Sequence, residues 1–145
     1  MKIMFVCTGN TCRSPMAEAV AKSVFPEDKY EIISRGISVY ANGPASANAQ
    51  QAVKNAGLDL SEHQSKQITE EDIKTSDVIF TMTNAHKQML MNVCARYGKP
   101  IFSLAEFVGS TEDVSDPYGG SLEVYEKCFK QIAGYVNMAS EIIEE

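Results

Sequence analysis

The sequence lacks an excess of basic residues, and it lacks a long hydrophobic segment. Lysine and arginine number 13 against 19 aspartates and glutamates, so the formal net charge is −6. Such a chain has no general positive field to attract nucleic acid or an anionic membrane surface. No apolar run is long enough to cross a bilayer, and the run from Ile3 to Cys7 is too short for the core of a signal peptide. We therefore expect no nucleic-acid or membrane partner and a cytoplasmic location.

Cysteine is scarce, with residues only at positions 7, 12, 94 and 128. A cytoplasmic chain of 145 residues does not need disulfides for stability, so we expect reduced thiols. The one close pair, Cys7 and Cys12, is separated by four residues, and no second Cys/His pair has the spacing of a zinc finger. We predict no metal site. Cys94 and Cys128 are expected to be packing residues on helices.

The chain also lacks internal repeats, linkers and low-complexity segments. With 44% hydrophobic residues, its length fits a single domain over residues 1–145. Apolar strand patterns alternate with helical patterns, which predicts an α/β fold: a three-layer sandwich in which helices flank a four-stranded parallel sheet. The predicted strands are Lys2–Val6, Glu31–Ser34, Val78–Met82 and Ile101–Leu104.

Apolar residues recur at helical spacing between these strands. A helix is predicted over Arg13–Val24, with Pro15 in its first turn, where a missing N–H costs nothing. A second is predicted over Ala45–Ala56, with Gly57 as its C-terminal stop. Thr69, followed by three acidic residues, predicts the capped start of a short helix.

Two further helices follow the third and fourth strands. One should begin near Asn84 and turn Met89, Leu90 and Val93 inward, with His86 at the surface. The last has apolar residues at alternating steps of four and three, which predicts a stripe packed toward the sheet. That stripe contains Tyr125, Phe129, Ile132, Val136, Ala139 and Ile143.

The residues Cys7 to Ser14 read C-T-G-N-T-C-R-S and follow the first predicted strand directly. A helix N-terminus with free N–H groups and a positive dipole end binds anions, and Gly9 allows the backbone to approach a ligand closely. The same field favours a thiolate on Cys7. The sequence therefore predicts a phosphate-binding loop after strand 1 with a nucleophilic sulfur at its base.

A mechanism follows from this loop. Cys7 would attack phosphorus and form a phosphocysteine intermediate, and the planar fork of Arg13 would hold two phosphoryl oxygens. Ser14 would hydrogen-bond the Cys7 sulfur. Asp116, in the loop Gly109–Ser121 with its D-P-Y-G-G-S segment, would protonate the leaving group. No metal or cofactor is required. The remaining phosphate donors are the backbone N–H groups of Thr8, Gly9, Asn10, Thr11, Cys12 and Arg13.

The segments V-C-T-G-N-T-C-R-S-P-M-A-E and D-P-Y-G-G-S, at opposite ends of the chain, resemble the low-molecular-weight protein tyrosine phosphatases. The order of strands and helices matches that family over essentially the whole chain. The resemblance implies a phosphorylated protein substrate, with Cys7 as nucleophile, Arg13 as phosphate ligand and Asp116 as general acid and then base. It also implies a supporting hydrogen-bond network that links Asn10, Ser14, Ser34 and His63.

The resemblance further implies where substrates are selected. Tyr40 and Tyr118 occupy positions similar to the two walls of the substrate crevice. Thr11 resembles the branch of the family that hydrolyses phosphoarginine on proteins, whereas most tyrosine phosphatases of the family carry a larger aliphatic residue there. Tyr118 departs from the phenylalanine often found in the arginine branch, so phosphotyrosine is the alternative substrate. Cys12 either faces the core or forms a reversible disulfide with Cys7.

Three other functions fit the pattern less well. A thioredoxin-coupled arsenate reductase needs a pair of resolving cysteines after the third strand, where this chain has T-M-T-N-A-H-K-Q. A phosphocysteine carrier of the sugar-transport type has no use for Arg13 or a remote acid. A non-catalytic phosphoprotein-binding module would not need both Cys7 and Asp116.

Overall fold

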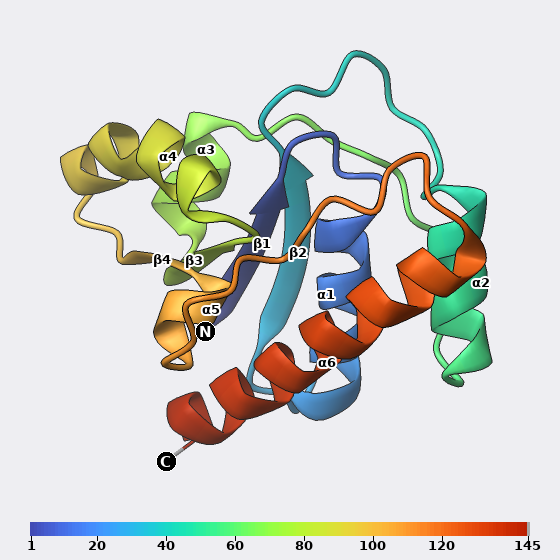
Figure 1. Ribbon diagram of the computed structural model, residues 1–145. Helices are drawn as coiled ribbons and strands as arrows, with labels where there is room; N and C mark the ends of the chain where they lie inside the picture. The colour runs from blue at the N-terminus through green and yellow to red at the C-terminus, as the bar shows by residue number, and fades with distance from the viewer. Residues whose placement is uncertain (145) are drawn as a thin grey trace.

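Four parallel strands form one sheet in the order β2-β1-β3-β4 in the computed structural model, which describes residues 1–144. In the register of the first strand with the edge strand β2, Lys2 lies opposite Glu31, and Cys7 lies opposite Gly36. The predicted α/β sandwich with a four-stranded parallel sheet is confirmed (Figure 1). The strands are β1 (Lys2–Cys7), β2 (Glu31–Gly36), β3 (Val78–Thr81) and β4 (Ile101–Ser103).

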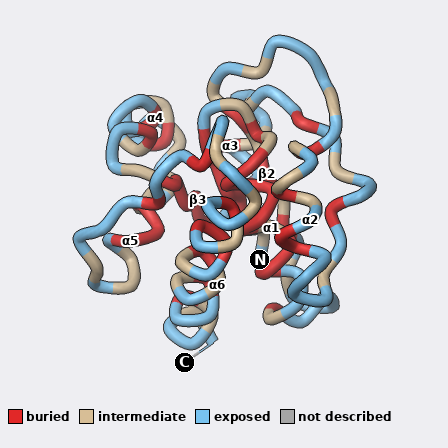
Figure 2. Tube along the Cα trace, turned by 45° about the vertical axis from the view of Figure 1, so that its right-hand side comes forward, coloured by how far each residue is buried: buried red, intermediate tan, exposed pale blue. Residues whose placement is uncertain are grey.

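Strand β1 is apolar on both faces because helices cover both faces of the sheet. Successive side chains of a strand point to opposite faces, so Ile3 and Phe5 belong to one core cluster, whereas Met4 and Val6 belong to the other. Buried residues accordingly line the strands and the inward sides of the helices (Figure 2). The first cluster includes residues of α1 (Arg13–Val24), α2 (Ala47–Asn55), α5 (Leu104–Phe107) and α6 (Leu122–Glu144), and the second includes residues of α3 (Glu70–Thr75) and α4 (Asn84–Arg96).

The helix termini follow local sequence signals. Helix α1 has the predicted bounds. Helix α2 begins two residues later than predicted because Ser46 is its N-cap and accepts a hydrogen bond from the Ala49 N–H, and Gly57 follows its end at φ 83°. Thr69 caps α3 as predicted, in a capping box with Asp72.

Helix α4 corrects two expectations. His86, expected at the surface, is buried, whereas Met89, expected to face inward, is exposed. His86, Leu90 and Cys94 are the buried residues of this helix and are spaced four residues apart, so they share one face. Met89 lies off that face. The buried stripe of α6 belongs to the same core cluster as Ile3 and Phe5, and α6 also packs against α1 and α2.

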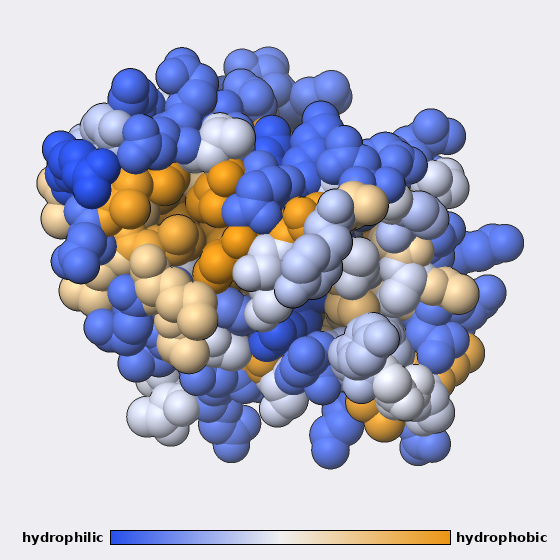
Figure 3. All heavy atoms as spheres, turned by 90° about the horizontal axis from the view of Figure 1, so that it is seen from above, coloured by the Kyte–Doolittle hydropathy of each residue, from blue (hydrophilic) through white to orange (hydrophobic). Residues whose placement is uncertain are grey.

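The carboxyl ends of β1 and β2 lie at the same edge of the sheet, where the loops after both strands meet (Figure 1). Figure 3 looks down on this edge, where hydrophilic residues cover much of the surface and apolar residues gather on the side of α3 and α4. The loop before α6 reaches the same edge, since the Val114 N–H donates to the carbonyl of Met82 at the end of β3. No helix within residues 1–144 has the length and apolar character needed to cross a membrane.

Candidate active site

In the loop between β1 and α1, carbonyl groups are bound by other segments, whereas several N–H groups have no protein partner among residues 1–144. Its carbonyl groups are bound from outside, by the Ser38 N–H to Thr8, the His63 Nε2–H to Asn10 and the Ser46 N–H to Thr11, at 2.8–2.9 Å. Within residues 1–144, the N–H groups of Gly9, Thr11 and Cys12 donate to no other protein group. Such a ring of free N–H groups at a helix start is a concave anion site.

Asn10 holds this loop in its shape. Its φ of 57° lies in the left-handed region, which asparagine tolerates better than most residues. Its side chain is fully buried: Nδ2 donates to Ser14 Oγ at 2.8 Å and to Ser34 Oγ at 3.0 Å, and Oδ1 accepts from the Lys66 N–H at 3.0 Å. The residues that the resemblance links in a network, Asn10, Ser14, Ser34 and His63, therefore lie in hydrogen-bonding contact.

The sulfur of Cys7 lies at the base of the loop and is buried. It accepts a hydrogen bond from the Asn10 N–H at 3.3 Å and lies 2.9 Å from Ser14 Oγ. Asn10 donates to Ser14 Oγ, so the Ser14 hydroxyl proton has two acceptors within reach, the Cys7 sulfur at 2.9 Å and the Arg35 carbonyl at 3.4 Å, and the sulfur is the nearer one. Both hydrogen bonds stabilise negative charge on the sulfur, as an attacking or leaving thiolate requires.

Arg13 brings a buried positive charge to the same place. Its side chain is only 7% exposed, Nη1 donates to the Val114 carbonyl at 2.9 Å, and Nη2 lies 3.8 Å from Asp116 Oδ2. Asp116 is 58% exposed in its side chain, and its Oδ1 accepts from the Tyr118 N–H at 3.1 Å. The loop before α6 thus places a carboxylate beside the guanidinium.

A pocket of about 490 Å³ opens above Cys7, and the predicted substrate-binding residues line it except for Asn10 and Ser14, which are fully buried behind the loop. Tyr40 and Tyr118, the predicted crevice walls, are both exposed and contribute to its lining, as does Thr11. The full lining comprises Cys7, Thr8, Gly9, Thr11, Cys12, Arg13, Ser38, Val39, Tyr40, Ala41, Ser65, Asp116 and Tyr118.

The four cysteines are all free in the described chain. Cys12 Sγ lies 3.3 Å from the Tyr125 hydroxyl and 3.4 Å from Ser46 Oγ. Burial and the contact with Cys12 raise the pKa of Tyr125 to about 12. Burial also raises the pKa of Cys94, and that of Cys128 to about 12, so these two remain protonated thiols. The disulfide between Cys7 and Cys12 stays a prediction.

Residues 2–144 match the family model described as low molecular weight phosphotyrosine protein phosphatase. The chain belongs to this family. It is therefore a low-molecular-weight protein phosphatase, as the loop and the remote aspartate predicted.

Curated relatives of this phosphatase differ in the residue they act on. The chain is 42% identical over 130 residues to the protein-arginine-phosphatase of Bacillus subtilis, in an alignment that covers 88% of this chain and 86% of the relative. It is 40% identical over 137 residues to the low molecular weight protein-tyrosine-phosphatase PtpB of Staphylococcus epidermidis, covering 94% and 95% of the two chains.

Similar solved structures likewise include both arginine and tyrosine phosphatases. A YwlE mutant from Bacillus subtilis superposes with a TM-score of 0.92 at 36% identity and covers 100% of this chain and 99% of that one. A second YwlE structure, with the same TM-score and identity, is described as an arginine phosphatase C7S mutant with a phosphorylated active-site serine, and the coverage is 100% and 97%. The low molecular weight protein tyrosine phosphatase of T. tengcongensis has a TM-score of 0.89 at 39% identity, with coverage of 97% and 98%.

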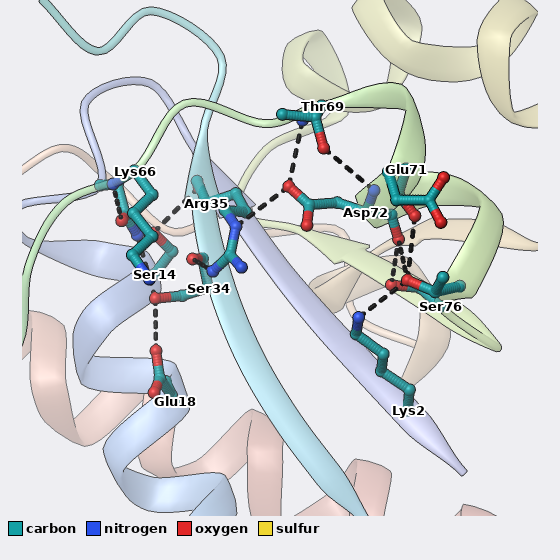
Figure 4. Close-up of polar contacts among 12 residues, drawn as sticks. Lys2, Ser14, Glu18, Ser34, Arg35, Lys66, Thr69, Glu71, Asp72 and Ser76 are labelled. Atoms are coloured by element: carbon teal, nitrogen blue, oxygen red, sulfur yellow. Dashed lines mark hydrogen bonds and ion pairs between the residues drawn. The ribbon is translucent and has the colours of Figure 1, made fainter.

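The structure adds two residues to the surroundings of this phosphatase site that sequence reasoning missed. Glu18 on α1 accepts from Ser34 Oγ at 2.5 Å, which extends the Asn10 network across to the helix (Figure 4). The second is His86 on α4, whose Nε2 atom lies 2.9 Å from Thr8 Oγ1. Glu18 lies on α1 about one helical turn after Ser14, and this spacing could have indicated that the two side chains share a face of the helix. For His86, the only signal was its four-residue spacing from Leu90 and Cys94.

Within residues 1–144, no three His, Cys, Asp or Glu side chains are grouped so that they could hold a metal ion. The charge of a bound phosphoryl group would instead meet the Arg13 guanidinium and the loop N–H groups. The site thus brings together a buried thiol, unpaired loop N–H groups, a guanidinium and a carboxyl group, which are the kinds of group that phosphoryl transfer to sulfur would use.

Proposed function

We propose that this chain is a metal-independent phosphoprotein phosphatase that hydrolyses phosphoarginine residues of proteins through a phosphocysteine intermediate. Thr11 in the pocket wall, together with Asp116 beside Arg13, is the observation that carries this proposal. The site residues Cys7, Arg13 and Asp116 take the roles predicted from the sequence, and one domain over residues 1–145 carries the activity.

In the first step, the Cys7 thiolate attacks phosphorus and forms a bond between sulfur and phosphorus. The bond between phosphorus and the guanidino nitrogen breaks, and its electron pair goes to the nitrogen. The Asp116 carboxyl group donates a proton to that nitrogen, so arginine leaves in protonated form. Arg13 and the loop N–H groups hold the phosphoryl oxygens during the transfer.

In the second step, water attacks the phosphocysteine. The Asp116 carboxylate accepts a proton from the water, the bond between sulfur and phosphorus breaks, and inorganic phosphate forms. Sulfur leaves as a thiolate that the Ser14 hydroxyl, 2.9 Å away, stabilises. The phosphorylated active-site serine in a YwlE cysteine-to-serine mutant supports a covalent intermediate at this position.

Phosphoarginine fits this pocket because Thr11 is small and polar and because Asp116 becomes a carboxylate once it has given its proton to the leaving group. The departing guanidinium carries positive charge, which a carboxylate at the mouth of the pocket can pair. The similarity to the Bacillus subtilis protein-arginine-phosphatase and to YwlE supports the same substrate class.

Phosphotyrosine is the second candidate substrate. The exposed rings of Tyr40 and Tyr118 both line the pocket and can stack on a phenyl ring. The 40% identity to PtpB supports this alternative. The cytoplasmic location predicted from the sequence remains a prediction.

One side-by-side assay tests the proposal. A protein carrying phosphoarginine and a phosphotyrosine peptide are offered to the purified, reduced enzyme, and phosphate release is measured. We expect a much higher kcat/KM on phosphoarginine and no turnover of either substrate by Cys7→Ser. A preference for phosphotyrosine would leave the mechanism intact and overturn the substrate assignment. A wild-type protein that hydrolyses neither substrate would contradict the enzymatic role.

A further inference from the structure

His86 connects α4 to the phosphate-binding loop. It lies in the first turn of the helix, where its N–H donates to the capping Thr83 Oγ1 at 3.1 Å. Its imidazole is buried, with 6% of the residue exposed, and Nε2 lies 2.9 Å from Thr8 Oγ1. Thr8 follows Cys7 directly and lines the pocket. A residue far away in sequence therefore contacts the first residue of the loop.

The surroundings of Nδ1, the second nitrogen of the His86 ring, indicate which of the two nitrogens carries the proton. His86 Nδ1 is buried and has no hydrogen-bond partner in the described chain. An orphaned buried N–H is rarer in proteins than an acceptor that lacks a donor. The neutral ring therefore carries its proton on Nε2 and leaves only a lone pair on Nδ1. Burial and the nearby charge of Arg13 lower the pKa of His86 to about 4, which outweighs the opposite effect of Asp113 and Asp116.

This tautomer determines the direction of the Thr8 hydroxyl. Nε2–H donates to Thr8 Oγ1, so the hydroxyl proton of Thr8 cannot point back at His86 and is available to the pocket. Ser14 is held in a similar way: the Asn10 amide donates to Oγ, and the hydroxyl proton has the Cys7 sulfur at 2.9 Å as its nearer acceptor and the Arg35 carbonyl at 3.4 Å as the other. In both cases a neighbour donates to the hydroxyl oxygen, and this turns the hydroxyl proton away from that neighbour.

We propose that His86 is a positioning residue that fixes the Thr8 hydroxyl as a hydrogen-bond donor to an oxygen of the bound phosphoryl group. The inference rests on the proposed function only in that the pocket binds a phosphoryl group. Thr8 then contributes a side-chain donor in addition to the loop N–H groups and Arg13.

The test is a double-mutant cycle on Thr8 and His86, with the affinity for inorganic phosphate as readout. Thr8→Val removes the hydroxyl at an exposed position and keeps the shape of the side chain. His86→Asn places an amide near the position of Nδ1, where it does not reach Thr8. A hydrogen bond to a charged group corresponds to about tenfold or more in affinity. We expect each single variant to weaken phosphate binding about tenfold in calorimetry, and the double variant to be no weaker than either.

His86→Gln is the matched variant, because its amide nitrogen reaches the position of Nε2 and should restore most of the phosphate affinity that His86→Asn loses. Leu90→Ala, a buried change on the same face of α4, should lower stability and leave phosphate affinity unchanged. The inference is overturned if Thr8→Val binds phosphate as tightly as the wild type, if the losses multiply to about a hundredfold in the double variant, or if His86→Gln binds as weakly as His86→Asn.

Hydrolysis of p-nitrophenyl phosphate by the same variants separates this inference from the proposed function. The pattern of kcat/KM should follow the pattern of phosphate affinity. If phosphate binding shows the expected coupling but the wild type hydrolyses nothing, the proposed function fails and the role of His86 stands.

Discussion

At the scale of single residues, a substitution of Thr11 is the smallest change that we expect to alter substrate choice. Its side chain lines the pocket above Cys7. Thr11→Ile removes a hydroxyl and adds apolar volume, so we expect the ratio of kcat/KM for phosphoarginine over phosphotyrosine to fall by roughly 10- to 100-fold. The ratio is measured with both substrates in parallel. Thr11→Val, which loses the hydroxyl but keeps the size, separates polarity from volume, and an unchanged ratio in Thr11→Ile contradicts the role of this residue.

The role of Asp116 is tested by replacing its carboxyl group with an amide of the same size, which cannot donate or accept the catalytic proton. Asp116→Asn should lower kcat by about 10²- to 10⁴-fold, because general acid and base catalysis contribute about this much. The inhibition constant of inorganic phosphate should change far less, since phosphate binding uses Arg13 and the loop N–H groups. Asp113→Asn is the control on the same loop, where the carboxylate binds the Asn84 N–H. Equal turnover in wild type and Asp116→Asn would mean that another group supplies the proton.

His86 makes stability depend on pH. Its folded-state pKa of about 4 lies below the ordinary value of 6.5, so between these values the unfolded chain binds a proton that the native protein excludes. Stability from this group is complete above pH 6.5 and is lost as the pH falls toward 4. Between pH 7 and pH 5, the free energy of unfolding measured in urea should fall by about 2 kcal/mol less in His86→Gln than in the wild type. Equal losses in the two proteins would contradict a buried neutral ring.

At the scale of elements, the sequence predicted what local patterns specify. Strand β1 was predictable because its five apolar residues lie between polar ones, and the start of α1 because Pro15 fits a first turn. The family resemblance implied the contacts of Asn10 with Ser34 and His63, but no local pattern predicted the contact of His86 with the loop. His86 on α4 meets Thr8 after β1 only because the parallel sheet places β3 beside β1, a distance of 78 positions in sequence. The reactive loop could be predicted, and with the resemblance its Asn10 network as well, but not the support that Glu18 and His86 give from behind.

Glu18 shows how α1 and β2 are held together behind the loop. Its carboxylate accepts a hydrogen bond from the Ser34 hydroxyl (Figure 4), and the Ser34 oxygen is left to accept one from Asn10 Nδ2. Glu18→Ala should lower the free energy of unfolding by about 1–3 kcal/mol, because it removes a charged acceptor from a partly buried hydroxyl. Lys22→Ala removes only the exposed partner of Glu18 and should cost about 0.5 kcal/mol or less. Urea unfolding of both variants tests this order, and equal losses would contradict it.

At the scale of the whole molecule, the site joins segments from most of the chain. The loop after β1 is bound by Ser38 and Ser46 from the segment before α2 and by His63 and Lys66 from the segment before α3. The Val114 carbonyl from the loop before α6 completes the shell around Arg13. A ligand that binds this assembled loop therefore binds only the folded chain, since unfolding separates all these segments.

Inorganic phosphate should consequently stabilise the protein by mass action. At a concentration one hundred times its Kd, a ligand of the native state adds about 2.7 kcal/mol, which for a chain of this size raises Tm by roughly 8 °C. The measurement is a thermal unfolding scan with phosphate, against chloride at equal ionic strength. In Arg13→Lys at the same phosphate concentration the rise should largely disappear, because lysine keeps the charge but cannot offer the planar fork. An equal rise in both proteins would mean that phosphate binds elsewhere, whereas a rise only in the wild type ties the stability of the whole fold to the anion held above Cys7.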